Sequence, residues 1–128
     1  MKKPTLYTYA KCSTCRNAVK WMREQGLEFA EKPIRDTPPS KAELQRMLGF
    51  QDGVLKKLFN TSGGDYRELK LGPKLADMTE KQAFELLAGN GNLVKRPFLL
   101  TDEAGLVGFK ADVWSAALAQ GSTRSSRG

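Results

Sequence analysis

The chain reads Thr-Leu-Tyr-Thr-Tyr-Ala-Lys-Cys-Ser-Thr-Cys-Arg-Asn at residues 5–17. The Thr- and Tyr-rich alternation at 5–9 predicts a β-strand. Beyond Cys12 the apolar residues recur at helical spacing, and Gly26 is a suitable helix stop. That spacing is carried by Cys15, Ala18, Val19 and Met22. The stretch therefore predicts a strand that turns directly into a helix, with a Cys-x-x-Cys motif at the turn.

A Cys-x-x-Cys motif at a strand-to-helix turn is typical of redox chemistry. The thiol of Cys12 would meet the unpaired N–H groups and the positive dipole end of the helix, which favour the nucleophilic thiolate. Lys11 and Arg16 flank the motif and act in the same direction. Cys15, about one turn further on, is placed to attack a mixed disulfide on Cys12. The alternative is that both cysteines are small buried apolar residues, but their position and the flanking charge favour catalysis.

The rest of the chain predicts a mixed α/β domain. Strand patterns occur at 27–34, 98–101 and 106–109, and helical patterns occur from Ser40 to Phe59, at 79–89 and at 111–119. Capping boxes begin two of these helices, at Ser40 and Thr79, and residues 60–65 are a loop by composition. The order β-α-β, helices, β-β-α is that of a thioredoxin-like fold with an inserted helical subdomain. We expect one domain over residues 1–120, the insertion at about 38–92, and a disordered tail at 121–128.

The charge of the chain is unevenly distributed. Its 128 residues include 21 Lys and Arg against 14 Asp and Glu, a net charge of +7. Residues 1–26 carry +5, residues 27–120 are neutral, and the last two positive charges lie in the tail. No Lys/Arg stripe or alternation of aromatic and basic residues accompanies this excess. We therefore expect no direct DNA or RNA binding.

Two absences narrow the chemistry further. The chain has no His, which excludes a Cys–His dyad and a His-ligated metal, and two Cys are too few for a structural zinc site. No metal or bound organic cofactor is implied. The chain has no apolar run of 18 residues, so we expect no membrane span and a cytoplasmic protein.

Arg96-Pro97 and Arg67 are further candidates for the site. In a thioredoxin-like fold the proline before the third strand would be cis and would place Arg96 beside Cys12, where its planar guanidinium could bind an anion. The alternative is a trans Pro97 next to a solvated arginine. From the pattern alone, Arg67 is better explained as a solvated loop arginine.

Four blocks of the sequence resemble the arsenate reductase-related (ArsC/Spx/MgsR) family, closest to its uncharacterised ArsC-like members. The blocks are Lys-Cys-Ser-Thr-Cys-Arg-Asn (11–17), Leu-Phe-Asn-Thr-Ser-Gly-Gly-Asp-Tyr-Arg-Glu-Leu (58–69), Lys-Arg-Pro-Phe-Leu (95–99) and Val-Gly-Phe (107–109). Their order and spacing make the match specific, and it covers about residues 5–118.

The resemblance implies a thioredoxin-like fold and a thiol-based site. Cys12 matches the cysteine that attacks arsenate, Arg16 matches the arginine after the loop, and Arg67 and Arg96 match two arginines that line the oxyanion site. Glutathione and glutaredoxin complete the cycle in that branch, and thioredoxin is the other candidate electron donor. We expect a monomer that acts on a small oxyanion or glutathione.

Two departures from the reductase pattern keep a second function open. The reductases carry a third oxyanion arginine on the last hairpin, where this chain has Val107-Gly-Phe-Lys110 and at best Lys110 as a substitute. They also lack a second cysteine at the position of Cys15. The Cys-x-x-Cys pair instead resembles the Spx branch, in which it is the redox switch of a transcription regulator that binds RNA polymerase.

Overall fold

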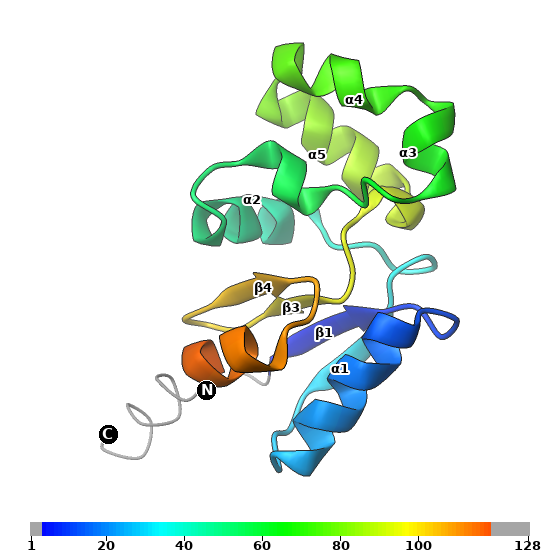
Figure 1. Cartoon of the computed structure of the whole chain (residues 1–128). Helices are drawn as coiled ribbons and strands as arrows, with labels where there is room; N and C mark the ends of the chain where they lie inside the picture. Colours follow the sequence, from blue (N-terminus) through cyan, green and yellow to red (C-terminus); the bar gives the residue numbers. More distant parts are fainter. Residues whose placement is uncertain (1–3, 119–128) are drawn as a thin grey trace.

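The computed structural model describes residues 4–118 and centres on a four-stranded sheet (Figure 1). The strand order is β2-β1-β3-β4. The strands are β1 (Thr5–Thr8), β2 (Ala30–Pro33), β3 (Phe98–Leu100) and β4 (Gly105–Val107). The pair β1–β2 is parallel, whereas β1–β3 and β3–β4 are antiparallel. The central strand β1 therefore ends at the same edge of the sheet as β2.

Helices cover both faces of this sheet (Figure 1). On one face, α1 (Ser13–Glu24) and the helical residues 111–118 bury a small cluster that includes Leu6, Leu99 and Trp114. On the other face, the helices between β2 and β3 pack on a larger cluster that includes Tyr7 and Phe98. Neighbouring residues of one strand thus serve opposite cores, as the two-residue period of a strand requires.

The segment between β2 and β3 forms a helical layer above the sheet (Figure 1). It contains α2 (Lys41–Phe50), α3 (Gly64–Glu68), α4 (Leu71–Lys74) and α5 (Glu80–Gly89), with short 3₁₀ turns at Leu55–Leu58, Leu75–Asp77 and Gly91–Leu93. The capping boxes predicted at Ser40 and Thr79 are both present. None of the helices within residues 4–118 is long and apolar enough to cross a membrane.

The thioredoxin-like α/β fold predicted from the sequence is confirmed, and several local predictions are corrected. The helical stretch predicted from Ser40 to Phe59 divides into α2 and the 3₁₀ turn at Leu55–Leu58, and the strand predicted at 106–109 is Gly105–Val107. The second strand begins at Ala30 rather than at Leu27, because residues 27–29 first complete the turn that follows α1. The predicted loop at 60–65 becomes helical at Gly64, where α3 begins. The predicted disordered tail at 121–128 lies outside the described residues.

A hydrogen bond joins the sheet to the helical layer. The hydroxyl of Tyr7 in β1 donates to Oε1 of Glu43 in α2 at 2.8 Å. Burial would raise the pKa of Glu43, but hydrogen bonds from the Ser40 amide and from Tyr7 outweigh it and leave this pKa below its usual value. A group whose pKa falls on folding stabilises the protein above its unfolded pKa, and this contribution is lost as the pH falls through the folded pKa.

We expect Tyr7→Phe to lower the free energy of unfolding by about 1–2 kcal/mol at pH 7, because a buried hydrogen bond to a charged acceptor is lost. The loss should shrink as acid protonates Glu43. Urea unfolding at pH 7 and in acid measures both effects. Tyr66→Phe is the matched control, since Tyr66 is buried and its hydroxyl makes no hydrogen bond within residues 4–118. Equal losses in the two variants would contradict the assignment.

Candidate functional site

Cys12 caps the N-terminus of α1. Its Sγ accepts a hydrogen bond from the backbone N–H of Cys15 at 3.3 Å, and its own N–H donates to the carbonyl of Tyr9 at 3.0 Å. No acidic residue lies in the first turn of α1 to compete for the positive end of the helix. The sulfur is half-buried. It therefore combines access from solvent with hydrogen bonding suited to a thiolate.

Cys15 lies one turn inside α1 and is only 1% exposed. Both cysteines are free thiols. Burial and a hydrogen bond with Cys12 raise the pKa of the Cys15 thiol to about 12, and the charge of Cys12 adds to the increase. A backbone hydrogen bond from Tyr9 and the positive charge of Arg96 act in the opposite direction. At neutral pH, Cys15 is thus held as a protonated thiol next to Cys12.

Arg96 acts on the Cys15 thiol through its charge, and the cis peptide bond predicted before Pro97 is present. The Arg96–Pro97 peptide bond is cis, and Pro97 is buried immediately before β3. The guanidinium of Arg96 lies over the ring of Tyr9, with Cζ 4.9 Å from the ring centroid. Its Nη1 is buried and has no hydrogen-bond partner among residues 4–118. Arg96 therefore brings a positive charge and an unused donor to the site.

The other two predicted arginines are placed differently. Arg16 is exposed on α1, and its Nη1 donates to the carbonyl of Ala10 at 3.1 Å, so that it braces the turn before Cys12. Arg67 is exposed on α3, and within the described chain its side chain makes no hydrogen bond or ion pair. An anion-binding role for either arginine stays a prediction.

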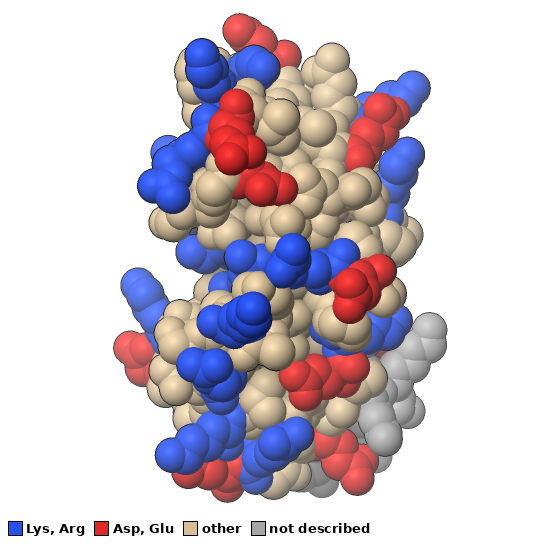
Figure 2. All heavy atoms as spheres, turned by 90° about the vertical axis from the view of Figure 1, so that its right-hand side faces the viewer, with Lys and Arg blue, Asp and Glu red and all other residues tan. Residues whose placement is uncertain are grey.

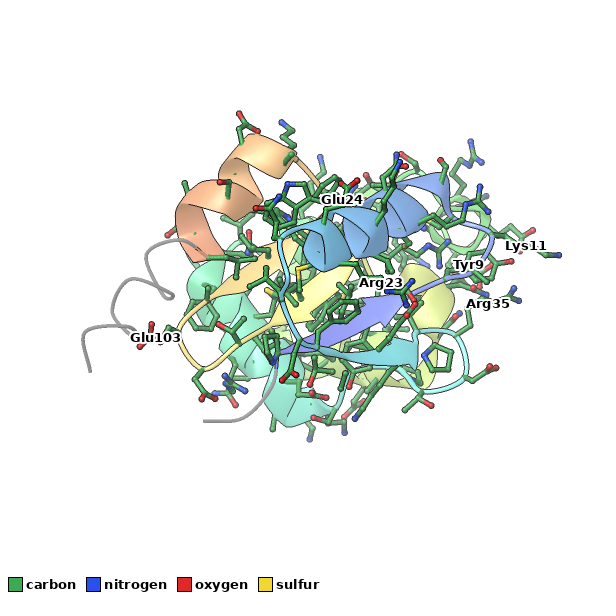
Figure 3. All side chains as sticks on the ribbon, turned by 90° about the horizontal axis from the view of Figure 1, so that it is seen from below. Tyr9, Lys11, Arg23, Glu24, Arg35 and Glu103 are labelled. Carbon is green, nitrogen blue, oxygen red and sulfur yellow. The ribbon has the colours of Figure 1, made fainter. Side chains whose placement is uncertain are left out.

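Sequence reasoning missed Arg35. This residue lies two positions after the end of β2, and its Nη1 donates to the hydroxyl of Tyr9 at 2.9 Å. Figure 3 shows Arg35 and Tyr9 side by side beyond the end of β1, with Lys11 further along the same loop. The available signal was the parallel pairing of the first two strands, because their carboxyl ends meet at one edge of the sheet.

Sequence reasoning also missed Asp65, which brings α3 to the site. Its Oδ2 accepts hydrogen bonds from the side-chain amides of Asn90 at 3.0 Å and Asn92 at 3.3 Å. These two bonds, and then the charges of Arg35 and Arg96, keep the pKa of Asp65 below its usual value. The carboxylate of Asp65, which belongs to the helical layer, thus interacts electrostatically with both arginines.

Grooves surround the cysteine loop. One of about 630 Å³ passes the thiol of Cys15 and the side chain of Arg16, and another of about 610 Å³ is lined by Arg35 and the loop 89–92. Both include residues 9–10, which precede the loop. Figure 2 shows Lys and Arg side chains gathered in a band at the level where the two halves of the molecule meet. An anion is the ligand that such a surface favours.

A third groove, of about 380 Å³, contains Lys110, the residue that could substitute for the third oxyanion arginine of the reductases. It is lined by Thr14, Arg96 and Lys110 among others, so Lys110 shares a groove with Arg96. Among residues 4–118, no group of three or more His, Cys, Asp or Glu side chains is arranged to hold a metal ion.

The thioredoxin-like topology and this cysteine loop agree with a match to a model of the ArsC family over residues 7–117. The chain belongs to the ArsC family. This ArsC-family chain is 50% identical over 108 residues to the uncharacterised protein YusI of Bacillus subtilis, covering 84% of this chain and 92% of YusI. It is 29% identical to the global transcriptional regulator Spx of Listeria innocua, covering 84% of this chain and 81% of Spx.

Two solved structures extend the comparison. An ArsC family related protein from Bacteroides fragilis is 43% identical, with a TM-score of 0.84, covering 91% of this chain and 99% of the other. A possible arsenate reductase from Streptococcus mutans is 35% identical, with a TM-score of 0.80, covering 87% of this chain and 94% of the other. The relatives of this ArsC-family chain thus include both proteins described as reductases and proteins described as regulators.

Proposed function

We propose that this protein is an arsenate reductase-like thiol–disulfide oxidoreductase in which Cys12 is the nucleophile and Cys15 the resolving thiol. The observation that carries the proposal is the arrangement of three groups. A half-buried Cys12 sulfur caps α1, a buried thiol lies one turn behind it, and Arg96 adds a buried donor without a partner. The match to a possible arsenate reductase at 35% identity supports the reaction class.

The first step forms a bond between sulfur and the substrate. The thiolate of Cys12 attacks arsenic(V) of a bound arsenate, and one arsenate oxygen leaves as water after protonation. The guanidinium of Arg96 balances the charge of the remaining oxygens and orients them through its planar donors. Arg16 and Arg67 are further candidate anion ligands, and Pro97 would adjoin the site next to Arg96 in the chain.

The second step uses Cys15. Its thiolate attacks Sγ of Cys12, the sulfur–arsenic bond breaks, and the bonding pair stays on arsenic, which leaves as arsenite. The two thiols become a disulfide and supply the two electrons. Cys12 raises the pKa of Cys15 through a hydrogen bond and through its charge. Burial is the main cause of the raised pKa and persists, but the hydrogen bond with the Cys12 thiol is lost once Cys12 carries the substrate, and Arg96 continues to lower the pKa of Cys15.

Regeneration requires an external reductant. Glutathione with glutaredoxin, or thioredoxin, would reduce the Cys12–Cys15 disulfide, and neither the chemistry nor the site calls for a metal or a bound organic cofactor. A reducing compartment such as the cytoplasm suits this cycle, because it keeps both thiols reduced between turnovers. The protein would act as a monomer on a small oxyanion or on glutathione itself.

A coupled turnover assay tests the proposal. The purified chain is mixed with arsenate and NADPH, together with either glutathione, glutaredoxin and glutathione reductase or thioredoxin and its reductase. We expect arsenate-dependent NADPH consumption with one of the two systems, and the active system identifies the donor. Absence of consumption with both systems, together with failure to reduce hydroxyethyl disulfide, would rule out an oxidoreductase.

The second candidate function is a redox-switched transcription regulator of the Spx type that binds RNA polymerase. The Cys-x-x-Cys pair and the 29% identity to Spx favour it. The protein would bind the polymerase rather than DNA, because residues 27–120 carry no net charge. A pull-down of purified RNA polymerase by the reduced and the oxidised protein distinguishes the candidates. Absence of polymerase from both samples would remove this function.

A further inference from the structure

Two arginines contact one aromatic ring at the edge of the site. The guanidinium carbons of Arg35 and Arg96 lie 5.0 and 4.9 Å from the centroid of the Tyr9 ring. Since both distances are measured from the same centroid, the two cations lie within about 10 Å of each other. Like charges at that separation repel, and the negative face of an aromatic ring offsets part of the repulsion. The Tyr9 ring therefore gathers two cations that come from separate parts of the chain.

Tyr9 also makes hydrogen bonds with both cysteines of the Cys-x-x-Cys motif. Its carbonyl accepts the N–H of Cys12, and its backbone hydrogen bonds to the Cys15 thiol. The charge of Arg96 is felt at that same thiol. The residue that shapes the loop thus also contacts the two cations, which ties their position to that of the reactive sulfur.

The hydrogen bonding of the two arginines is incomplete. A guanidinium has five N–H donors, and Nη1 of Arg96 is buried without an acceptor. Within the described part of the chain, the exposed side chain of Arg35 makes one hydrogen bond, to the Tyr9 hydroxyl. A buried donor without a partner is unfavourable, and an oxyanion would supply the missing acceptor.

The nearby carboxylate does not satisfy these donors. Oδ2 of Asp65 is already engaged by the amides of Asn90 and Asn92. Within the described residues, Asp65 forms no ion pair with Arg35 or Arg96, although the charges of both arginines are felt at its carboxyl. Asp65 therefore moderates the positive potential and leaves the guanidinium donors available.

We propose that Arg35 and Arg96 together bind one oxyanion group of the ligand beside Cys12, and that Tyr9 is the positioning residue that holds the two guanidinium groups for it. Arg35 would then supply a cation in place of the third oxyanion arginine that the reductases carry on the last hairpin. The oxyanion is either the inorganic tetrahedral substrate or a carboxylate of a peptide thiol. The place of this site in catalysis rests on the proposed function, but its affinity for an anion does not.

Equilibrium binding tests the proposal without turnover. Sulfate and, separately, S-methylglutathione are titrated into the reduced protein at constant ionic strength, and binding is followed by NMR shifts of backbone amides and arginine Nε–H groups. We expect Arg35→Gln to weaken binding of one of these probes by about tenfold or more, as loss of a charge-assisted contact does. The probe affected identifies the source of the oxyanion.

The matched control is Arg46→Gln, which removes the same charge from α2, where Arg46 instead bonds the carbonyl of Thr101. Its affinity should stay within about twofold of the parent. Unchanged binding in Arg35→Gln, an equal loss in Arg46→Gln, or no binding of either probe by the parent protein would overturn the proposal. Intact binding in a protein without turnover would instead count against the proposed function alone.

Two substitutions test the positioning role of Tyr9. Tyr9→Leu removes the ring and should weaken anion binding by about as much as Arg35→Gln, whereas Tyr9→Phe keeps the ring and should retain binding within about threefold. The ring should also shift the Nε–H resonances of Arg35 and Arg96, and this shift should disappear in Tyr9→Leu but survive in Tyr9→Phe. Wild-type binding in Tyr9→Leu, at unchanged thermal stability, would overturn the positioning role.

Discussion

Cys12→Ser is expected to lower arsenate or disulfide turnover by about a thousandfold or more, because a serine hydroxyl stays protonated where a thiolate attacks. The substitution replaces one atom in a half-buried position, so the fold should persist. The coupled NADPH assay measures the rate, and circular dichroism checks the fold. Turnover that persists at the parent rate in a folded Cys12→Ser protein would exclude Cys12 as the nucleophile.

The matched control is Cys15→Ser, which keeps the nucleophile and removes the resolving thiol. The first bond should still form, and the adduct on Cys12 should then accumulate or be resolved by added glutathione. Intact mass spectrometry after incubation with hydroxyethyl disulfide separates the two variants. We expect a mixed disulfide on Cys12 in Cys15→Ser and no adduct in Cys12→Ser, because Cys15 is almost completely buried and burial is the main cause that raises the pKa of its thiol. Labelling of Cys15 in Cys12→Ser would contradict this division of roles.

The fold could be predicted largely because local patterns and tertiary packing agree. The spacing of Cys15, Ala18 and Met22 marks the face of α1 that is buried on the sheet. The helical pieces over residues 64–77 could not be predicted, since α3 and α4 span only five and four residues. Helices this short are stabilised by packing of residues such as Tyr66 and Leu71 rather than by a repeating pattern.

The candidate site was only partly predictable, for a related reason. Cys12, Cys15 and Arg96-Pro97 have local signatures: a motif at a helix start and a proline before a strand. Arg35 and Asp65 have none, because what marks them is their distance from Tyr9, Asn90 and Asn92 in the folded chain. For Arg16 the sequence shows the position directly after the motif, but it does not show the hydrogen bond that the side chain donates to the carbonyl of Ala10.

The charge pattern acquires a local meaning in the structure. The +7 net charge suggests a polyanion partner at first sight. The two arginines that contact the Tyr9 ring, Arg35 and Arg96, come from residues 27–120, a segment without net charge. Folding gathers these two cations beyond the carboxyl end of β1, in a region where Glu31 and Asp36 line the same groove as Arg35 and where Asp65 is engaged by amides. A small anion fits that distribution better than an extended one.

Gly91 is the position where we expect a single methyl group to destabilise this arrangement most. A Cβ built on Gly91 would overlap the carbonyl oxygen of Ile34 and would lie 2.8 Å from Cα of Arg35. Both neighbours are backbone, so the clash cannot be relieved by rotating a side chain. We expect Gly91→Ala to lower the free energy of unfolding by about 3 kcal/mol or more, the upper range for overpacking. For a chain of this size, that corresponds to a Tm lower by about 10 °C.

Gly89→Ala is the matched control two residues earlier. It lies at the end of α5, where an added Cβ meets nothing within 4 Å, and alanine should stabilise the helix by up to about 1 kcal/mol. Calorimetry should therefore show a lower Tm for Gly91→Ala and a higher Tm for Gly89→Ala than for the parent protein. Because Gly91 lies between Asn90 and Asn92, and against the residue that precedes Arg35, Gly91→Ala should also weaken sulfate binding at temperatures where it is folded. A variant with parent stability and parent affinity would show that the contact between residues 34–35 and the loop 89–92 does not support the site.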